Sequence, residues 1–169
     1  MKRIALITAC CCALGAGASS SASAPALARC QAPQLKLAGS LQGATQSLGG
    51  SLTLLNRGDR ACALPALPRR VSLQIGAKVL PVLTVPLARG LWPPGVRTRS
   101  LPAHAGANVA IQWRNWCGRP RGNVHLKVGL TIFRTATRRN SVGLVRTPVC
   151  VARRISSRVG VSGFVTPVP

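Results

Sequence analysis

Few side chains in this 169-residue sequence could carry acid–base or nucleophilic chemistry. Asp59 is the only side-chain carboxylate, there is no Glu, and the only histidines are His104 and His125. Mechanisms that need two carboxylates in one chain are therefore excluded, and so are oxygen-rich cages for Ca²⁺ or Mg²⁺. A Ser-His-Asp triad would have to use Asp59. Its turn, Arg57-Gly58-Asp59-Arg60, favours a carboxylate that caps backbone N–H groups or pairs with an arginine.

The two histidines are interpreted as solvated surface side chains. His104 falls in a predicted loop, and His125 falls on the exposed face of a predicted strand. The sequence has no Gly-x-Ser-x-Gly elbow of the kind that presents a nucleophilic serine. A hydrolase that brings one of these histidines together with Asp59 and a hydroxyl is retained as an alternative hypothesis. Otherwise we predict a non-enzymatic protein with no catalytic residue, no cofactor and no metal site.

Cysteine usage points to an oxidising compartment. Three of the seven cysteines, Cys10 to Cys12, fall in an apolar N-terminal segment. The others form an even set that we interpret as two disulfides, with three connectivities open. They are Cys30, Cys62, Cys117 and Cys150. A zinc site is not predicted, because the sequence has no Cys-x-x-Cys pair and no closely spaced Cys and His.

The first 28 residues have the order of a secretory signal peptide: basic Met1-Lys2-Arg3, an apolar run over 4–18, and small residues over 19–28. We predict cleavage between residues 22 and 28 and a single domain over 29–169. The apolar run of about 15 residues is short of the roughly 20 that span a bilayer, and no second run follows. No transmembrane span is therefore predicted in the mature chain. A lipoprotein, with Ile7-Thr8-Ala9-Cys10 as a loose lipobox, is the alternative.

The 23 Lys and Arg residues give a formal net charge of +22, which should attract polyanions such as nucleic acid, acidic wall polymers or anionic lipid. Arginines recur in close pairs, and eight of them are candidate polyanion contacts: Arg69, Arg70, Arg119, Arg121, Arg138, Arg139, Arg153 and Arg154. The competing interpretation is charged loops that keep an apolar domain soluble. No specific nucleic-acid site is predicted, because the candidate stacking aromatics are scattered at Trp92, Trp116, Phe133 and Phe164.

The elements that must position these residues are predicted to be strands. Apolar residues alternate with polar ones over 71–75, 109–113 and 124–132, as in strands with one buried face. Weaker strands are predicted over about 34–38, 50–56, 78–85, 97–101, 141–146 and 158–166, with turns at clusters that include Gly49-Gly50. Short strands at this spacing, without an amphipathic helix, predict an all-β antiparallel sandwich. Only 3% of the residues are aromatic, so its core must be aliphatic.

Strand parity assigns two side chains near the middle of the chain to the core. Counting in twos from Val109 passes Trp113 and reaches Cys117, so both should face inward if the strand is unbroken. Trp116 has the opposite parity and should lie on the outer face or under a loop. A tryptophan packed beside a disulfide is common in sandwich cores.

Several of these features lie in a recurring order: Cys30, Asn56 shortly before Cys62, Trp113-Arg114-Asn115-Trp116-Cys117, and Pro148-Val149-Cys150. Over residues 30–166 the sequence resembles the secreted actinobacterial-type family known as domain of unknown function 4232. The resemblance implies an immunoglobulin-like β-sandwich on exported or lipid-anchored proteins, with this cysteine framework, Trp113 in the core, and no established activity. The sequence departs from the family after Cys62, where Ala63-Leu64-Pro65-Ala66-Leu67-Pro68 stands in place of a Gly-x-Pro turn.

These observations favour an exported, non-enzymatic domain that acts at the cell envelope by binding or as a structural part. A cationic polyanion-binding protein is the second hypothesis, with an acidic wall polymer, nucleic acid or anionic lipid as its ligand. The partner itself is not readable from the residues.

Overall fold

The computed structural model describes residues 26–44 and 46–167. Residues 1–25, which hold most of the predicted signal peptide and the alternative lipobox, lie outside the described residues. The described chain is almost entirely strand and loop, with short 3₁₀ turns at Ala32–Gln34 and Arg89–Leu91. The all-β prediction is therefore confirmed.

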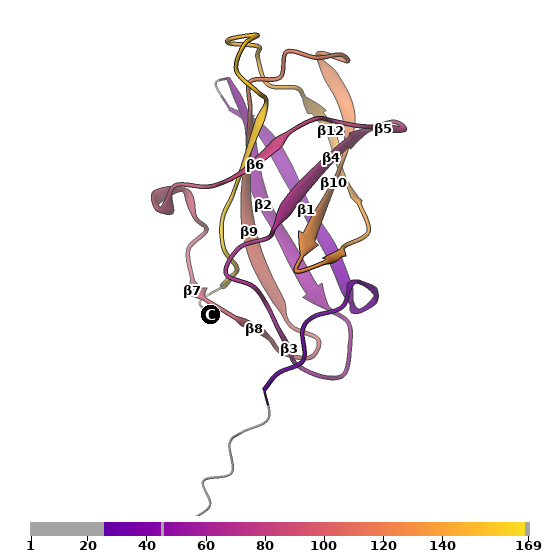
Figure 1. Ribbon diagram of the computed structural model, residues 1–169, viewed down its shortest axis with the longest axis vertical. Coiled ribbons are helices and arrows are strands. Elements are labelled where there is room, and N and C mark those ends of the chain that lie inside the picture. The colour runs from indigo at the N-terminus through magenta and orange to yellow at the C-terminus, as the bar shows by residue number, and fades with distance from the viewer. Residues whose placement is uncertain (1–25, 45, 168–169) are drawn as a thin grey trace, which may run out of the picture.

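Two mainly antiparallel sheets face each other (Figure 1). The first sheet has the order β1-β2-β9-β13-β6, and β14 joins β9 to β7 at its edge. Its strands are β1 (Leu35–Ala44), β2 (Ser47–Asn56), β6 (Leu83–Pro86), β7 (Val96–Arg97), β9 (Gly106–Arg114), β13 (Arg158–Val161) and β14 (Val165–Thr166).

The second sheet has the order β11-β10-β4-β5, with β12 also paired to β10. A separate two-stranded ladder joins β3 to β8 at one end of the molecule (Figure 1). The strands are β3 (Cys62–Ala63), β4 (Arg70–Ile75), β5 (Lys78–Val79), β8 (Ser100–Leu101), β10 (Asn123–Ile132), β11 (Thr135–Ala136) and β12 (Asn140–Arg146).

The strand order is that of an immunoglobulin-like sandwich. In chain order, β1, β2 and β9 occupy the A, B and E positions of one sheet, and β4, β10 and β12 occupy the C, F and G positions of the other. One strand departs from this order, because β13 lies between β9 and β6 and pairs with β6 in parallel. Strand β13, which follows all strands of the second sheet in the chain, thus occupies an inner position of the first sheet.

The strands with the clearest predicted alternation, β9 and β10, bury alternate side chains as expected. Along β9 and most of β10, every second side chain is buried, and the core between the sheets is mainly Leu, Val and Ile. Three weaker predicted strands are each divided in two. The predicted 78–85 strand becomes β5 and β6, 97–101 becomes β7 and β8, and 158–166 becomes β13 and β14.

The predicted turn at Gly49-Gly50 is wrong, because both glycines lie inside β2. Gly50 instead marks a close approach between strands. A Cβ atom on Gly50 would clash with the carbonyl oxygen of Ser40 in the neighbouring strand β1. The real hairpin turn is between Ala44 and Ser47, where Gln46 has a φ of 62°.

Trp113 is completely buried, as predicted, and its Nε1 donates to Ser157 Oγ at 2.8 Å. The predicted parity fails beyond it, because β9 ends at Arg114 and Asn115 has a φ of 56°. Cys117 is consequently only half-buried. Trp116 lies under a loop, where its Nε1 donates to the Pro120 carbonyl at 2.8 Å and its ring lies 5.6 Å from that of Trp113.

The four cysteines form the disulfides Cys30–Cys62 and Cys117–Cys150, so the sequential connectivity is the correct one. The first bond ties the N-terminal segment to β3, and the second joins the loop after β9 to the loop after β12. Two disulfides in one small domain indicate an oxidising environment. No helix within the described residues is long and apolar enough to cross a membrane.

The close approach at Gly50 generates a stability prediction. The substitution Gly50→Ala should lower the free energy of unfolding by about 1–3 kcal/mol, because its methyl group meets backbone that cannot move without separating β1 from β2. The matched control is Gly43→Ala in β1, where an added Cβ has no atom within 4 Å. Urea denaturation of both variants checks this, and equal midpoints for the two would contradict it.

Candidate functional site

All of the charge that the structure describes is on the surface. Of the 23 Lys and Arg residues only Lys2 and Arg3 fall outside the described residues, and each of the other 21 is exposed. Within residues 26–44 and 46–167, the one ion pair joins Asp59 to His104. The arginines and lysines that the structure describes therefore have no carboxylate partner in this chain.

Four of these cations surround one cavity of about 470 Å³. Lys36 comes from β1, Arg57 follows β2, and Arg138 and Arg139 precede β12. They are far apart in sequence, and the packing of β1 beside β12 brings them together. No side-chain carboxylate lines this cavity, so the four charges repel one another, and a bound anion would lower that repulsion.

A second cavity, of about 810 Å³, lies between β4, β6 and the end of β10. Arg69, Arg70 and Arg134 supply its charge, and Thr84, Thr131 and Phe133 are among its other lining residues. The guanidinium of Arg29 lies over the Phe133 ring, 5.0 Å from its centroid. Guanidinium groups match phosphate and carboxylate geometry through paired N–H donors.

A strained hairpin turn links the two cavities. Ile132 pairs with Thr135, so Phe133 and Arg134 are the two central residues of the turn between β10 and β11. Phe133 has a φ of 54°, a left-handed conformation that favours glycine at such a position and costs a bulky residue about 1–3 kcal/mol. Packing of the ring against the core offsets part of this cost. The segment 133–139 supplies Arg134 to one cavity and Arg138 and Arg139 to the other.

We name the seven cations of these two cavities the basic band: Lys36, Arg57, Arg69, Arg70, Arg134, Arg138 and Arg139. Four of them belong to the eight arginines that the sequence singled out. Sequence reasoning missed Lys36, Arg57 and Arg134, because none belongs to a close pair of arginines and only the sheet pairing brings them to the cavities.

The other four predicted contacts lie outside the basic band. Arg119, Arg121 and Arg153 line a cavity of about 660 Å³ beside Cys117, and Arg154 is exposed in the same loop as Arg153. Arg121 is partly engaged within the protein, because its guanidinium donates to the Cys117 carbonyl at 3.0 Å and to the Gly118 carbonyl at 3.3 Å. The predicted arginine set is thus divided among separate cavities.

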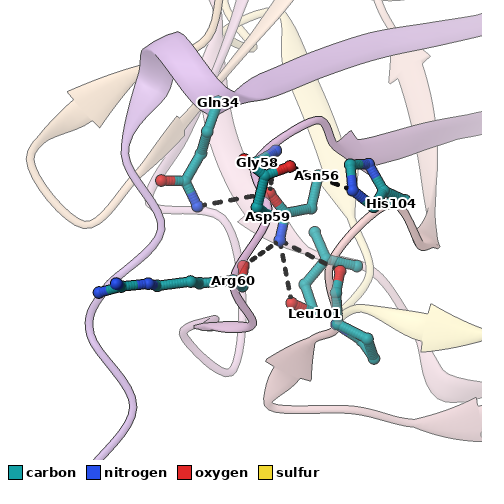
Figure 2. Close-up of polar contacts among 8 residues, drawn as sticks. Gln34, Asn56, Gly58, Asp59, Arg60, Leu101 and His104 are labelled. Atoms are coloured by element: carbon teal, nitrogen blue, oxygen red, sulfur yellow. Dashed lines mark hydrogen bonds and ion pairs between the residues drawn. The ribbon is translucent and has the colours of Figure 1, made fainter.

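The turn that contains Asp59 is held by a neighbouring amide, not by the carboxylate (Figure 2). The buried side chain of Asn56 accepts from the Gly58 N–H at 2.9 Å and donates to the carbonyls of Arg60, Leu101 and Pro102 at 2.8, 3.3 and 3.1 Å. The prediction that Asp59 caps this turn or pairs with an arginine is therefore wrong. Asn56 already fills the capping position, and Asp59 points out to His104.

Asp59 Oδ1 lies 3.3 Å from His104 Nε2, with the two side chains 94% and 67% exposed. An ion pair as solvated as this contributes little to stability. Among the described residues, His104 has no hydrogen bond to a hydroxyl, and His125 is exposed on a different element, β10. The structure brings together two of the three groups that a hydrolase would need, on an open surface. Of the described residues, no three His, Cys, Asp or Glu are grouped to hold a metal ion.

Comparison with protein-family models, with curated proteins and with solved structures gave no match to this chain. A function can therefore be inferred only from the chemistry of the chain itself, and first from the basic band.

The Asn56 contacts generate a second stability prediction. The isosteric substitution Asn56→Asp should lower the free energy of unfolding by about 3 kcal/mol, because a buried carboxylate has no N–H to give the three carbonyls that Asn56 contacts. The reciprocal substitution Asp59→Asn is the control, and it should leave the urea midpoint unchanged because Asp59 is exposed. A midpoint for Asn56→Asp within error of the wild type would disprove the assigned role of Asn56.

Proposed function

We propose that this chain is an exported, non-enzymatic β-sandwich domain that works at the cell envelope by binding, with a signal peptide that is cleaved between residues 22 and 28. The two disulfides and the leader pattern support export. The scarcity of acid–base groups supports a binding role. Membership of the family known as domain of unknown function 4232 is part of this proposal, supported by the cysteine framework and by Trp113 in the core.

The ligand class that we propose is an extended polyanion, and the basic band is the observation that carries it. Seven cations line two cavities that contain no side-chain carboxylate, and the two cavities share the segment 133–139. Such a surface contacts repeated phosphate or carboxylate groups without reading a sequence. Only one aromatic ring, Phe133, lies in the band and Arg29 covers it, which does not favour a track of stacked bases.

Salt dependence of heparin binding tests the polyanion proposal. For the wild type, the logarithm of the association constant should fall linearly with the logarithm of salt concentration. Arg138→Ser with Arg139→Ser should weaken binding and reduce the magnitude of that slope by about 2, one for each contact. The control is Lys78→Ser with Arg89→Ser, which removes the same charge outside the band and should reduce the slope far less. Equal slopes for the two double variants would refute the assigned site.

The N-terminus of the native protein tests the export proposal. Ala28 belongs to the folded domain, because its carbonyl accepts from the Ala63 N–H at 2.8 Å beside the Cys30–Cys62 bond. Cleavage upstream of Ala28 keeps this contact, so we expect a mature chain that begins between residues 23 and 28 and has all four remaining cysteines oxidised. Intact-mass spectrometry checks both points. A retained Met1, or a lipid on Cys10, would contradict the proposed processing.

A further inference from the structure

The loop between β12 and β13 exposes aliphatic side chains at one end of the sandwich, the upper end in Figure 1. Val149, Val151 and Ile155 are 58%, 63% and 51% exposed, and all three fall within ten residues of one another. Isolated exposed aliphatics are ordinary, but several on one loop mark a contact surface. We name these three side chains the apolar loop.

Buried polar contacts fix the apolar loop in this outward position. The Asn115 side chain accepts from the N–H groups of Val151 and Ala152 at 2.9 and 3.0 Å. It also donates to the carbonyls of Ala152 and Ile155 at 3.0 and 2.6 Å, which uses its full hydrogen-bonding capacity. The Cys117–Cys150 disulfide adds a covalent tie. The loop therefore cannot turn its apolar side chains inward without breaking these contacts.

Arginines surround the apolar loop. Arg114 and Arg158 face each other across β9 and β13, a like-charge pair that is unfavourable by itself. The same two arginines, with Val151 and Ile155, line a cavity of about 460 Å³. Arg153 and Arg154 lie in the loop, and Arg146 shares a smaller cavity with Val149.

The only side-chain carboxylate lies at the other end of the molecule. Strands β2 and β9 are antiparallel, with Ser47 opposite Arg114 and Leu55 opposite Gly106, so the Asp59 turn after β2 is distant from the apolar loop. The end that carries the apolar loop thus combines exposed aliphatic side chains with uncompensated positive charge. A matching partner must be both apolar and anionic.

We infer that this end of the sandwich docks on an anionic lipid bilayer, with lipid phosphates at Arg114 and Arg158 and the apolar loop in the headgroup–acyl boundary. A soluble anion would gain nothing from the aliphatic side chains, and a second copy of the chain would bring the same arginines against each other. A short apolar loop and a basic cluster each bind a membrane weakly, and together they can hold a protein at its surface. The inference goes beyond the proposed function, because it uses other residues and adds aliphatic contacts with lipid.

Vesicle sedimentation of the mature chain tests this inference. The protein should bind vesicles of phosphatidylcholine with 30% phosphatidylglycerol and should not bind vesicles of phosphatidylcholine alone. Val151→Ser with Ile155→Ser should weaken binding about tenfold, and so should Arg153→Ser with Arg154→Ser. The matched controls are Leu91→Ser with Val96→Ser, which removes equally exposed aliphatics away from this loop, and Arg89→Ser with Arg99→Ser, which removes two exposed arginines outside the basic band. Both controls should bind within about twofold of the wild type.

Any result that differs from these expected binding strengths overturns the inference. No binding to anionic vesicles, or equal binding by all variants, would exclude a bilayer site at this end. A dimer in light scattering that Val151→Ser with Ile155→Ser dissociates, without vesicle binding, would assign the surface to a second copy. Heparin binding separates this inference from the proposed function, since the Val151 and Ile155 variant should bind heparin as the wild type does. Thermal unfolding of each variant establishes that it is folded.

Discussion

A single side-chain carboxylate among 21 exposed Lys and Arg residues is the constraint on which the rest of this structure depends. A buried arginine needs an acidic partner, and the one carboxylate side chain, Asp59, is itself exposed beside His104, so every described cation lies in water. The interior is left to aliphatic side chains, and the polar contacts inside it are made by neutral groups. Trp113 bonds to Ser157, the Leu130 N–H bonds to Thr137, and no buried side-chain nitrogen or oxygen of the described residues lacks a partner.

The same constraint explains how the ends of the sandwich are built. Loops in many domains are held partly by ion pairs, but here two buried asparagines and two disulfides do this. Asn56 fixes the turn after β2 beside Cys62, and Asn115 fixes the loop after β12 beside Cys117. These contacts are insensitive to salt, whereas the repulsion among the surface cations is weakened by it. The asparagine hydrogen bonds and the disulfides therefore hold the loops without using the surface Lys and Arg side chains, which stay available to bind a partner.

Much of the architecture could be predicted, because local alternation reports directly on burial. The β9 and β10 residues alternate so clearly that their strands, their buried faces and the sandwich follow from the sequence alone. The pair Gly49-Gly50 gave a wrong turn prediction, because a glycine such as Gly50 that permits close strand packing looks the same in sequence as one that permits a turn. The prediction that Cys117 faces inward failed for a related reason. Asn115 has a left-handed backbone conformation that ends the strand, and nothing in the alternation of polar and apolar residues marks it.

The candidate sites could be predicted only in part. Close pairs such as Arg138 and Arg139 are visible in the sequence, but their partners Lys36 and Arg57 come from other strands. The apolar loop was also hidden, because Val149 and Val151 read as ordinary residues of a β protein. Their exposure depends on the hydrogen bonds of Asn115, which lies more than thirty residues earlier in the chain.

The place of β13 has a consequence for how the chain matures. The strand lies between β9 and β6, and it follows every strand of the second sheet in the chain. A polypeptide is synthesised from its N-terminus, so β6 has no neighbour in the first sheet until Arg158–Val161 have emerged. The core also waits for Val159, Val161 and Phe164, which are buried. Completion of the first sheet therefore waits for residues that follow every strand of the second sheet, a delay that fits the proposed export, because an exported chain crosses its translocation channel unfolded.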